Sequence, residues 1–304
     1  MSLVRAGSLG EAVEAMAALP EALLLSGGTE VLVGLHERRI APRHLVSLRR
    51  VPGLRGVLSA SSEELLLGAL TTYTELGTAT ATATATGAVP GSGRIGENPS
   101  VLTAMAPTVG SPASRNAGTL GGALGTGSGA GDACTALLAL DAQLLVSSVS
   151  GSRRVPIARW LDRGDRRHGD VVTAVAVAPT TGGQHYLKPG ERQAVSYATV
   201  SCALVVDAAS RRVRLALGSV GPLPWRALEA EGWLAQELGW DGNVPVADAA
   251  LCARFAEQIR AELPEPTAGP RVSAAHRRHI AGVLASRALS RAAGVSAQRS
   301  QAAA

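Results

Sequence analysis

The chain has 304 residues, 46% of them hydrophobic and 17% charged, with a formal net charge of +5. This length suffices for two or three domains with real cores, and the hydrophobic content excludes an intrinsically disordered chain. The positive charge comes almost entirely from dispersed arginines with few aromatic residues between them, which disfavours nucleic-acid binding.

The spacing of apolar and metal-ligating residues indicates neither a membrane span nor a metal site. No run of about 18 apolar residues exists, and the N-terminal residues lack the apolar segment of a signal peptide, so we expect a soluble, cytoplasmic protein. Cys134, Cys202 and Cys252 lie far apart, form no iron–sulfur or disulfide pattern, and the six histidines do not cluster. Any redox chemistry would therefore depend on an organic cofactor.

The N-terminal part alternates predicted helices and strands. Residues 8–20 predict an amphipathic helix that begins with a capping box of Ser8 and Glu11 and ends at a proline. Residues 22–31, ALLLSGGTEV, predict a buried strand that runs into a glycine turn and a short helix. HLVSL and ELLLGAL predict two further strands. This order favours α/β layers.

The middle of the chain contains two stretches of unusual composition. Residues 78–93, TATATATATGAVPGSG, are low in complexity and predict a surface loop. After them, Asn98 is the predicted N-cap of a helix over 98–109. Beyond the glycine-rich residues 111–132 we expect a helix capped by Asp132, and then the strands QLLVSS and DVVTAVAVAP.

The last third of the chain predicts a small α+β domain. Two antiparallel strands, over 194–207 and 211–221, are joined by the turn AASR. Helices are expected to begin near Pro224, Pro245 and Ser273.

The glycine-rich stretch SPASRNAGTLGGALGTGSGAGD, residues 111–132, holds seven glycines. A flexible linker contains few apolar residues, whereas these glycines alternate with Leu120 and Leu124. Glycine ahead of a helix N-terminus lets backbone amides approach a phosphate, and SGGTEV at 26–31 has the same context. Two such loops suit a pyrophosphate, although plain glycine turns are the alternative. Neither is GxGxxG or a P-loop, which disfavours Rossmann and NTPase folds.

Four segments appear in an order that resembles the FAD-binding medium subunit of molybdenum hydroxylases, the carbon monoxide dehydrogenase, xanthine dehydrogenase and aldehyde oxidase group. They are LLLSGGTEVLVGL, LLLGALTTYTEL, VGSPASRNAGTLGGALGTGSGAGDACTALLALDA and VSCALVVD with RVRLALGSVGPLPWRALEAE. The resemblance covers about residues 1–290, and RNAGTLGG is its most specific part.

The resemblance implies an α+β fold of the PCMH type. Two α/β subdomains, over 1–58 and 59–180, would clasp FAD. A C-terminal α+β domain over 184–293 would hold a three-stranded sheet with helices, and residues 294–304 would be a disordered tail.

The resemblance also implies two pyrophosphate loops that act mainly through backbone amides. The first would consist of Gly27, Gly28, Thr29 and Glu30. The second would consist of Gly118, Thr119, Gly121 and Gly122.

The remaining implied FAD contacts are side chains. Thr71 and Thr72 would lie near the flavin, with a helix start as the alternative. Asp132 would accept hydrogen bonds from the adenosine ribose, a role compatible with that of an N-cap. Lys188, the only lysine of the chain, matches the lysine of the family's Tyr-x-Lys pattern. No residue pattern indicates a catalytic acid, base or nucleophile.

Two positions depart from the family pattern. Ala123 stands where the family commonly has Asn, and Tyr73 stands where it commonly has His. Both departures change the polar groups available to a flavin.

The function implied by the resemblance is electron transfer. FAD would receive electrons from the iron–sulfur clusters of a small [2Fe-2S] subunit, which a large molybdenum-cofactor subunit supplies, and would pass them to NAD⁺, a quinone or O₂. The complex would be a hetero-oligomer, a dimer of heterotrimers. The alternatives are a self-contained FAD oxidoreductase of the vanillyl-alcohol-oxidase type, which needs its own substrate pocket, and a flavin-free scaffold subunit.

Overall fold

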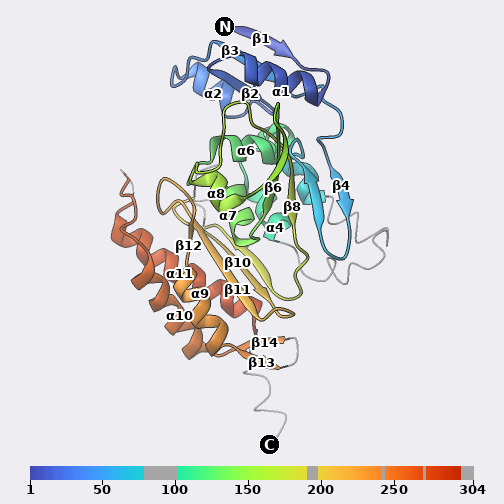
Figure 1. Ribbon diagram of the computed structural model, residues 1–304. Helices are drawn as coiled ribbons and strands as arrows, with labels where there is room; N and C mark the ends of the chain where they lie inside the picture. The colour runs from blue at the N-terminus through green and yellow to red at the C-terminus, as the bar shows by residue number, and fades with distance from the viewer. Residues whose placement is uncertain (79–100, 190–197, 242–243, 270–271, 296–304) are drawn as a thin grey trace, which may run out of the picture. The chain divides into compact units, whose positions relative to one another are not determined.

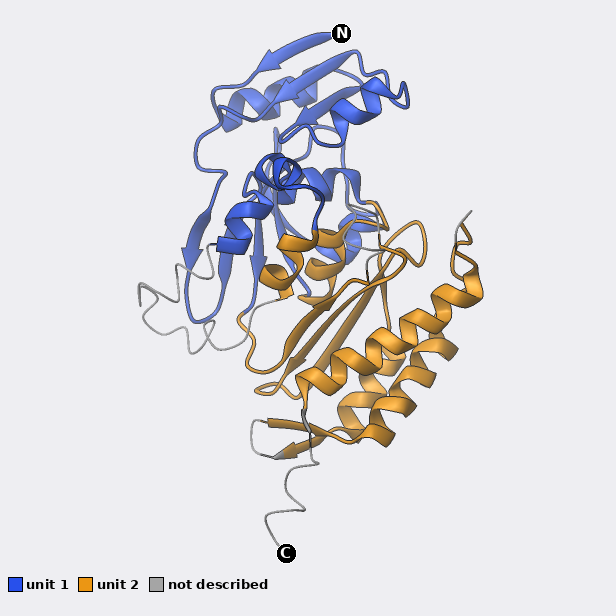
Figure 2. Cartoon of the chain, turned by 180° about the vertical axis from the view of Figure 1, so that it is seen from behind, with its two compact units in different colours: residues 1–92, 109–127, 141–178 blue, residues 93–108, 128–140, 179–304 orange. Residues whose placement is uncertain are grey.

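The computed structural model describes residues 1–78, 101–189, 198–241, 244–269 and 272–295. The chain divides into two compact units, each built from several separate segments (Figure 2). Unit 1 comprises residues 1–92, 109–127 and 141–178, and unit 2 comprises residues 93–108, 128–140 and 179–304. The predicted Thr-Ala tract from residue 79 onward and the predicted cap Asn98 lie outside the described residues.

Unit 1 begins with a three-stranded parallel sheet in the order β1-β3-β2 (Figure 1). Its strands are β1 (Ser2–Arg5), β2 (Ala22–Leu25) and β3 (His44–Ser47), joined by α1 (Leu9–Ala18) and α2 (Val31–His36). The capping box is confirmed, because the Ser8 hydroxyl accepts from the Glu11 amide at 3.1 Å and the Glu11 carboxylate accepts from the Gly7 amide at 2.8 Å. β1 was not predicted, since its four residues carry no apolar run.

The second sheet of unit 1 has five antiparallel strands in the order β4-β5-β8-β6-β7. They are β4 (Val57–Ala60), β5 (Leu65–Gly68), β6 (Gln143–Ser148), β7 (Gly151–Pro156) and β8 (Val171–Val177). The central β8 is buried along nearly its whole length, as its run of valine and alanine predicts. After β7, α8 (Ile157–Leu161) places the Trp160 indole N–H 2.9 Å from the Leu124 carbonyl oxygen.

The glycine-rich stretch is not a single loop, contrary to the prediction. It contains α5 (Pro112–Ala117) and α6 (Leu120–Thr126). Both helices begin at a side-chain cap: the Ser111 hydroxyl accepts from the Ser114 amide at 3.2 Å, and the Thr119 hydroxyl accepts from the Gly122 amide at 3.1 Å. The Thr119 cap stabilises α6, whose three glycines disfavour a helix.

Unit 2 is built on an antiparallel sheet in the order β12-β11-β10-β9. The strands are β9 (Gln184–Leu187), β10 (Ser201–Asp207), β11 (Arg212–Gly218) and β12 (Trp225–Arg226), so a two-residue fourth strand joins the three that the resemblance implied. The predicted β10–β11 hairpin and the α+β character are confirmed.

Helices cover the sheet of unit 2. α9 (Leu228–Glu237), α10 (Ala249–Glu262) and α11 (Ala274–Ala292) pack on one side (Figure 1). The alternate residues Cys202, Leu204 and Leu215 face them in the core. The opposite side packs against α7 (Asp132–Ala139), all of whose residues are buried.

The smaller elements of unit 2 are α4 (Val101–Met105), the 3₁₀ turn η1 (Ala106–Thr108), and a third sheet of β13 (Gly239–Asp241), β14 (Val244–Ala247) and β15 (Gly294–Val295). Residues 294 and 295, which we assigned to a tail, instead pair with β14 in parallel register. Residues 296–304 lie outside the described residues.

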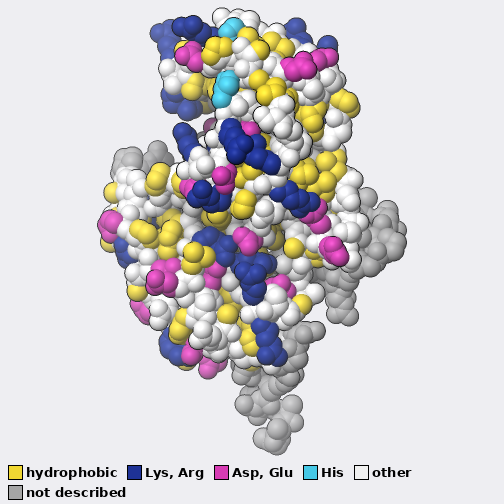
Figure 3. Space-filling view, in the orientation of Figure 1, with side chains coloured by type: hydrophobic (Ala, Val, Ile, Leu, Met, Phe, Trp, Pro, Cys, Tyr) yellow, Lys and Arg dark blue, Asp and Glu magenta, His cyan; other side chains and the backbone are white. Residues whose placement is uncertain are grey.

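Acidic and basic side chains are interspersed on the face seen in Figure 3. Exposed ion pairs include Arg154 with Glu64 and Arg254 with Glu237, and such pairs stabilise a fold little because solvent screens them. Among the helices that the structure describes, none combines the length and apolar character that spanning a bilayer requires.

Burial raises the pKa of the Cys202 thiol to about 12. Because the thiolate is the reactive form, we expect native protein to leave Cys202 unmodified by iodoacetamide at mildly alkaline pH and guanidinium-unfolded protein to alkylate it. Peptide mass mapping measures the difference; rapid labelling of Cys202 in the native state would contradict it.

Candidate functional site

The first glycine turn, Ser26–Glu30, joins β2 to α2 in unit 1. Gly28 has φ +77°, a left-handed conformation that favours glycine. The backbone amides of Gly27, Gly28, Thr29 and Glu30 donate to no acceptor among the described residues. Four successive N–H groups without a protein partner form a surface suited to a bound anion.

The second glycine turn, Gly118–Gly122, links α5 to α6 and lies directly against the first. A Cβ atom at Gly27 would overlap the Ala117 carbonyl oxygen and lie 3.2 Å from the Gly118 nitrogen. No side chain fits between the two backbones at this point. The structure thus brings together the two segments that the sequence analysis paired.

Most amides of the second glycine turn already have protein partners. Gly118 donates to the Ser114 carbonyl at 2.7 Å, and Gly121 donates to the Ala69 carbonyl at 2.7 Å. Gly122 donates to the Thr119 hydroxyl. The Thr119 amide itself has no acceptor within the described part of the chain. Fewer amides of this turn could therefore donate to a ligand than the resemblance implied.

Two glycines of the second turn are required by packing within the protein. A Cβ at Gly118 would lie 2.9 Å from the ring of Tyr73, and one at Gly121 would lie 2.9 Å from the Ala69 carbonyl oxygen. From the sequence we expected these glycines to let a phosphate approach the backbone. Tyr73 is itself buried, so this departure from the family pattern serves as a packing residue.

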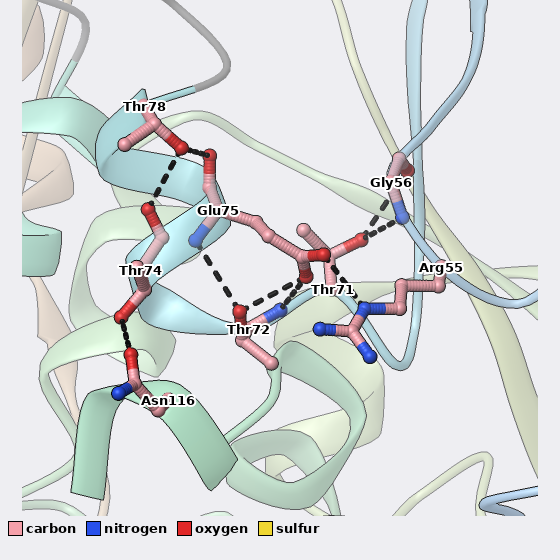
Figure 4. A network of polar contacts seen from close by, with 8 residues as sticks. All are labelled: Arg55, Gly56, Thr71, Thr72, Thr74, Glu75, Thr78 and Asn116. Atoms are coloured by element: carbon pink, nitrogen blue, oxygen red, sulfur yellow. Dashed lines mark hydrogen bonds and ion pairs between the residues drawn. The ribbon is translucent and has the colours of Figure 1, made fainter. Parts of the chain in front are cut away.

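Thr71 and Thr72 are buried and their hydroxyls bond within the protein (Figure 4). Thr71 exchanges two hydrogen bonds with the backbone of Gly56, at 2.9 and 3.2 Å. Thr72 caps the helical turn that begins at Tyr73, because its hydroxyl accepts from the Glu75 amide and the Glu75 carboxylate accepts from the Thr72 amide at 2.9 Å. The structure therefore shows the helix start, our alternative, at Thr72, whereas Thr71 holds the backbone at Gly56.

The threonine network extends to residues that sequence reasoning did not select. Glu75 accepts from Arg55 Nε at 2.6 Å, and the Thr74 hydroxyl donates to Asn116 Oδ1 at 2.6 Å (Figure 4). Asn116 belongs to the RNAGTLGG motif. Part of that motif therefore anchors α5 to the threonine segment.

In unit 2, Asp132 is the first residue of α7, and its N-cap is Gly131. The predicted Asp132 cap is wrong, because the side chain makes no capping bond. Its carboxylate instead accepts from the Tyr186 hydroxyl at 2.5 Å and from Lys188 Nζ at 2.7 Å. Lys188 also donates to the Thr108 carbonyl at 3.1 Å.

This buried cluster unites two predicted residues with one that was missed. The side chains of Asp132 and Lys188 are each 9% exposed. Burial raises the pKa of the Tyr186 phenol well above its usual value, and the negative charge of Asp132 raises it further. The phenol therefore keeps its proton near neutral pH and can donate a hydrogen bond to Asp132. The Tyr-x-Lys spacing was the available signal, since alternate residues of a strand share one face.

Neither site contains a recognisable metal centre. Within the described ranges, no three His, Cys, Asp or Glu side chains come together as a metal site. The first glycine turn offers donors for an anion, and Asp132 offers a fixed carboxylate for hydroxyl groups.

Family models cover nearly the whole described chain. Residues 1–180 match the model described as "FAD binding domain in molybdopterin dehydrogenase". Residues 185–292 match "CO dehydrogenase flavoprotein C-terminal domain".

Curated relatives and a solved structure agree with these matches. The chain is 30% identical to the xanthine dehydrogenase FAD-binding subunit of Escherichia coli O157:H7, covering 75% of this chain and 76% of that one. It is 28% identical to the carbon monoxide dehydrogenase medium chain of Hydrogenophaga pseudoflava, with 94% of each covered. The structure of carbon monoxide dehydrogenase from Hydrogenophaga pseudoflava lacking the Mo-pyranopterin moiety aligns with a TM-score of 0.81 and 25% identity over 96% of each chain.

We expect Glu75→Gln to destabilise the protein by about 0.5–1 kcal/mol near neutral pH. Partial burial acts to raise the pKa of Glu75, but hydrogen bonds from the Thr72 amide, Arg55 and the Thr72 hydroxyl lower it overall. The ionised carboxylate therefore stabilises the fold above the ordinary glutamate pKa, and this contribution is lost as the pH falls through the lowered value.

Denaturant unfolding at about pH 7 and about pH 4 measures the effect, with the exposed Glu14→Gln as control. The difference between wild type and Glu75→Gln should shrink at the lower pH. A constant difference would contradict the ion-pairing role.

Proposed function

Because this chain belongs to the family of FAD-binding domains in molybdopterin dehydrogenases, we propose that it is the electron-relaying subunit of a molybdenum hydroxylase. The chain is an FAD-binding oxidoreductase subunit of the carbon monoxide and xanthine dehydrogenase type. The proposal concerns the residues that hold FAD, the partners and the electron acceptor.

The first glycine turn is our principal candidate for the pyrophosphate. The amides of Gly27, Gly28, Thr29 and Glu30 supply four donors that have no acceptor among the residues the structure describes, and this is the main support for a pyrophosphate site. Glycine also keeps side chains away from an approaching phosphate. The Thr119 amide would add one donor from the second turn.

The other residues of the second glycine turn would act by placing the first. Gly118, Gly121 and Gly122 use their amides within the protein, and Gly118 lies against Gly27. Thr71 and Thr72 would hold the adjoining backbone in the same way. We therefore propose a rigid cradle in which few groups contact FAD and many fix their positions.

In unit 2, Asp132 would be the acceptor for the adenosine ribose hydroxyls. Its carboxylate is fixed by Tyr186 and Lys188 and retains lone pairs on both oxygens. Lys188 would assist by holding the carboxylate in place, because it donates to both Asp132 and the Thr108 carbonyl.

When bound, the isoalloxazine of FAD would supply both one-electron and two-electron chemistry, accepting electrons from a [2Fe-2S] partner subunit and delivering them to NAD⁺, a quinone or O₂. A large molybdenum-cofactor subunit would hydroxylate the substrate, within a hetero-oligomer. Relatives named as a medium chain and as an FAD-binding subunit support this division of labour.

Gly122→Ala should lower FAD affinity about tenfold, whereas Gly125→Ala should leave it unchanged. A Cβ at Gly122 would stand 3.1 Å from the Thr119 hydroxyl and 3.6 Å from the Ser26 hydroxyl, between the two turns. At Gly125, in the same helix, a Cβ would meet nothing within 4 Å. Quenching of flavin fluorescence on titration measures the FAD affinity of both variants. Equal affinities would contradict the proposal that the two glycine turns form the pyrophosphate cradle.

The full chain produced alone should bind FAD yet contain no iron or molybdenum. Isolated by an affinity tag from its native cell, it should bring with it a [2Fe-2S] protein and a molybdenum-cofactor protein, which metal analysis detects. Turnover of an organic substrate by the isolated, FAD-loaded chain at roughly 1 s⁻¹ or faster would contradict the relay and favour a self-contained flavoenzyme.

A further inference from the structure

The Tyr186–Asp132–Lys188 cluster fixes one carboxylate from two directions. The Tyr186 hydroxyl donates to Oδ1 at 2.5 Å, and Lys188 Nζ donates to Oδ2 at 2.7 Å. A carboxylate otherwise rotates broadly about its terminal torsion. With a different donor on each oxygen, the plane of the Asp132 carboxylate is set.

The two donors come from β9 and from the residue that directly follows it. Tyr186 lies in β9 and pairs with Ala203 of β10, and Lys188 follows two residues later, on the same face. That face is the one that α7 covers, because Leu187 between them packs into the core on the helical side. The sheet thus presents the phenol and the ammonium together to the first residue of α7.

The backbone before Asp132 is fixed as well. Gly129 donates to the Pro222 carbonyl at 3.0 Å and accepts from the Ser219 amide at 2.7 Å. A side chain at residue 129 would overlap the Gly221 carbonyl oxygen. The turn after β11 therefore determines where α7 begins, and β9 determines how its first carboxylate is oriented.

Resting on the proposed function, we infer that Tyr186 is a positioning residue that makes Asp132 selective for a vicinal diol, the 2′- and 3′-hydroxyls of the FAD adenosine ribose. Each oxygen of an ionised carboxylate has about two acceptor positions. Tyr186 and Lys188 occupy one on each oxygen. One acceptor position therefore remains on each oxygen, so the carboxylate can accept one hydrogen bond from each of two adjacent hydroxyls.

The cluster also balances the charge at Asp132. Lys188 offsets the negative charge of Asp132, so a carboxylate can stand near an anionic dinucleotide without an unbalanced repulsion. Tyr186 adds no charge, because its buried phenol remains protonated. Removing the phenol hydroxyl should therefore change the orientation of the Asp132 carboxylate while preserving its ion pair with Lys188.

The test uses the full 304-residue chain and four ligand titrations: FAD, ADP, 2′-deoxy-ADP and, as a baseline, inorganic pyrophosphate. We expect wild type to prefer ADP to 2′-deoxy-ADP by about tenfold, the effect of one hydrogen bond to a charged group. In Tyr186→Phe the preference should fall to about twofold, with a comparable loss of FAD affinity and pyrophosphate binding unchanged.

A matched control is Ser210→Ala. Its hydroxyl donates to the Asp207 carboxylate at 2.6 Å, in the exposed turn of the β10–β11 hairpin. This variant removes the same type of bond and should retain the tenfold preference. Thermal unfolding without ligand shows whether either substitution has damaged the fold.

If Tyr186 had only a structural role, Tyr186→Phe would weaken the binding of ADP and of 2′-deoxy-ADP equally. An unchanged ratio of the two affinities would therefore overturn the inference. If Tyr186→Phe does not fold, the same affinity ratio is measured in Lys188→Arg, which keeps the positive charge but moves the N–H donors. An unchanged ratio in Lys188→Arg would also overturn the inference. Wild type that binds no FAD at all would refute the proposed function, whereas normal FAD binding with an unchanged ratio would refute the positioning role alone.

Discussion

The approach of Gly27 to the Ala117 carbonyl, backbone against backbone, is the contact on which the candidate site of unit 1 depends. It holds the first glycine turn against α5, and the amides of that turn have no acceptor among the residues the structure describes. The partners of the second turn, Tyr73 and Ala69, are positioned in their turn by the capped segment at Thr72. The unpaired donors are thus few, and much of the surrounding motif serves to place them.

Elements with strong periodicity or a clear hairpin could be predicted from the sequence. The β10–β11 hairpin, β8 and the capping box at Ser8 and Glu11 are each encoded within a few residues. Helix α6 could not be recognised, because its glycines lower its intrinsic helix propensity. The caps of α5 and α6, at Ser111 and Thr119, become visible only as contacts in the structure. Local patterns therefore predicted the scaffold better than the glycine-rich segment.

The candidate site shows a similar division. The pairing of the two glycine segments was predicted, but the separate tasks of their residues were not, since a sequence does not tell whether an amide donates inward or outward. Asp132 illustrates the limit. Its place ahead of an apolar helix predicts an N-cap. Its carboxylate instead accepts from Tyr186, which lies 54 residues later in the chain, and the local sequence gives no sign of that contact.

The interleaving of the two units bears on how the protein is made. Helix α7 is entirely buried, yet the strands on which it packs, β10 and β11, are translated long after it. During synthesis α7 must remain without its cover while unit 1 resumes with β6, β7 and β8. Such long-range pairing is slow and leaves apolar surface open to aggregation. The nascent chain should accordingly engage chaperones until residues beyond β11 have left the ribosome, and no single cut of the gene would yield either unit intact.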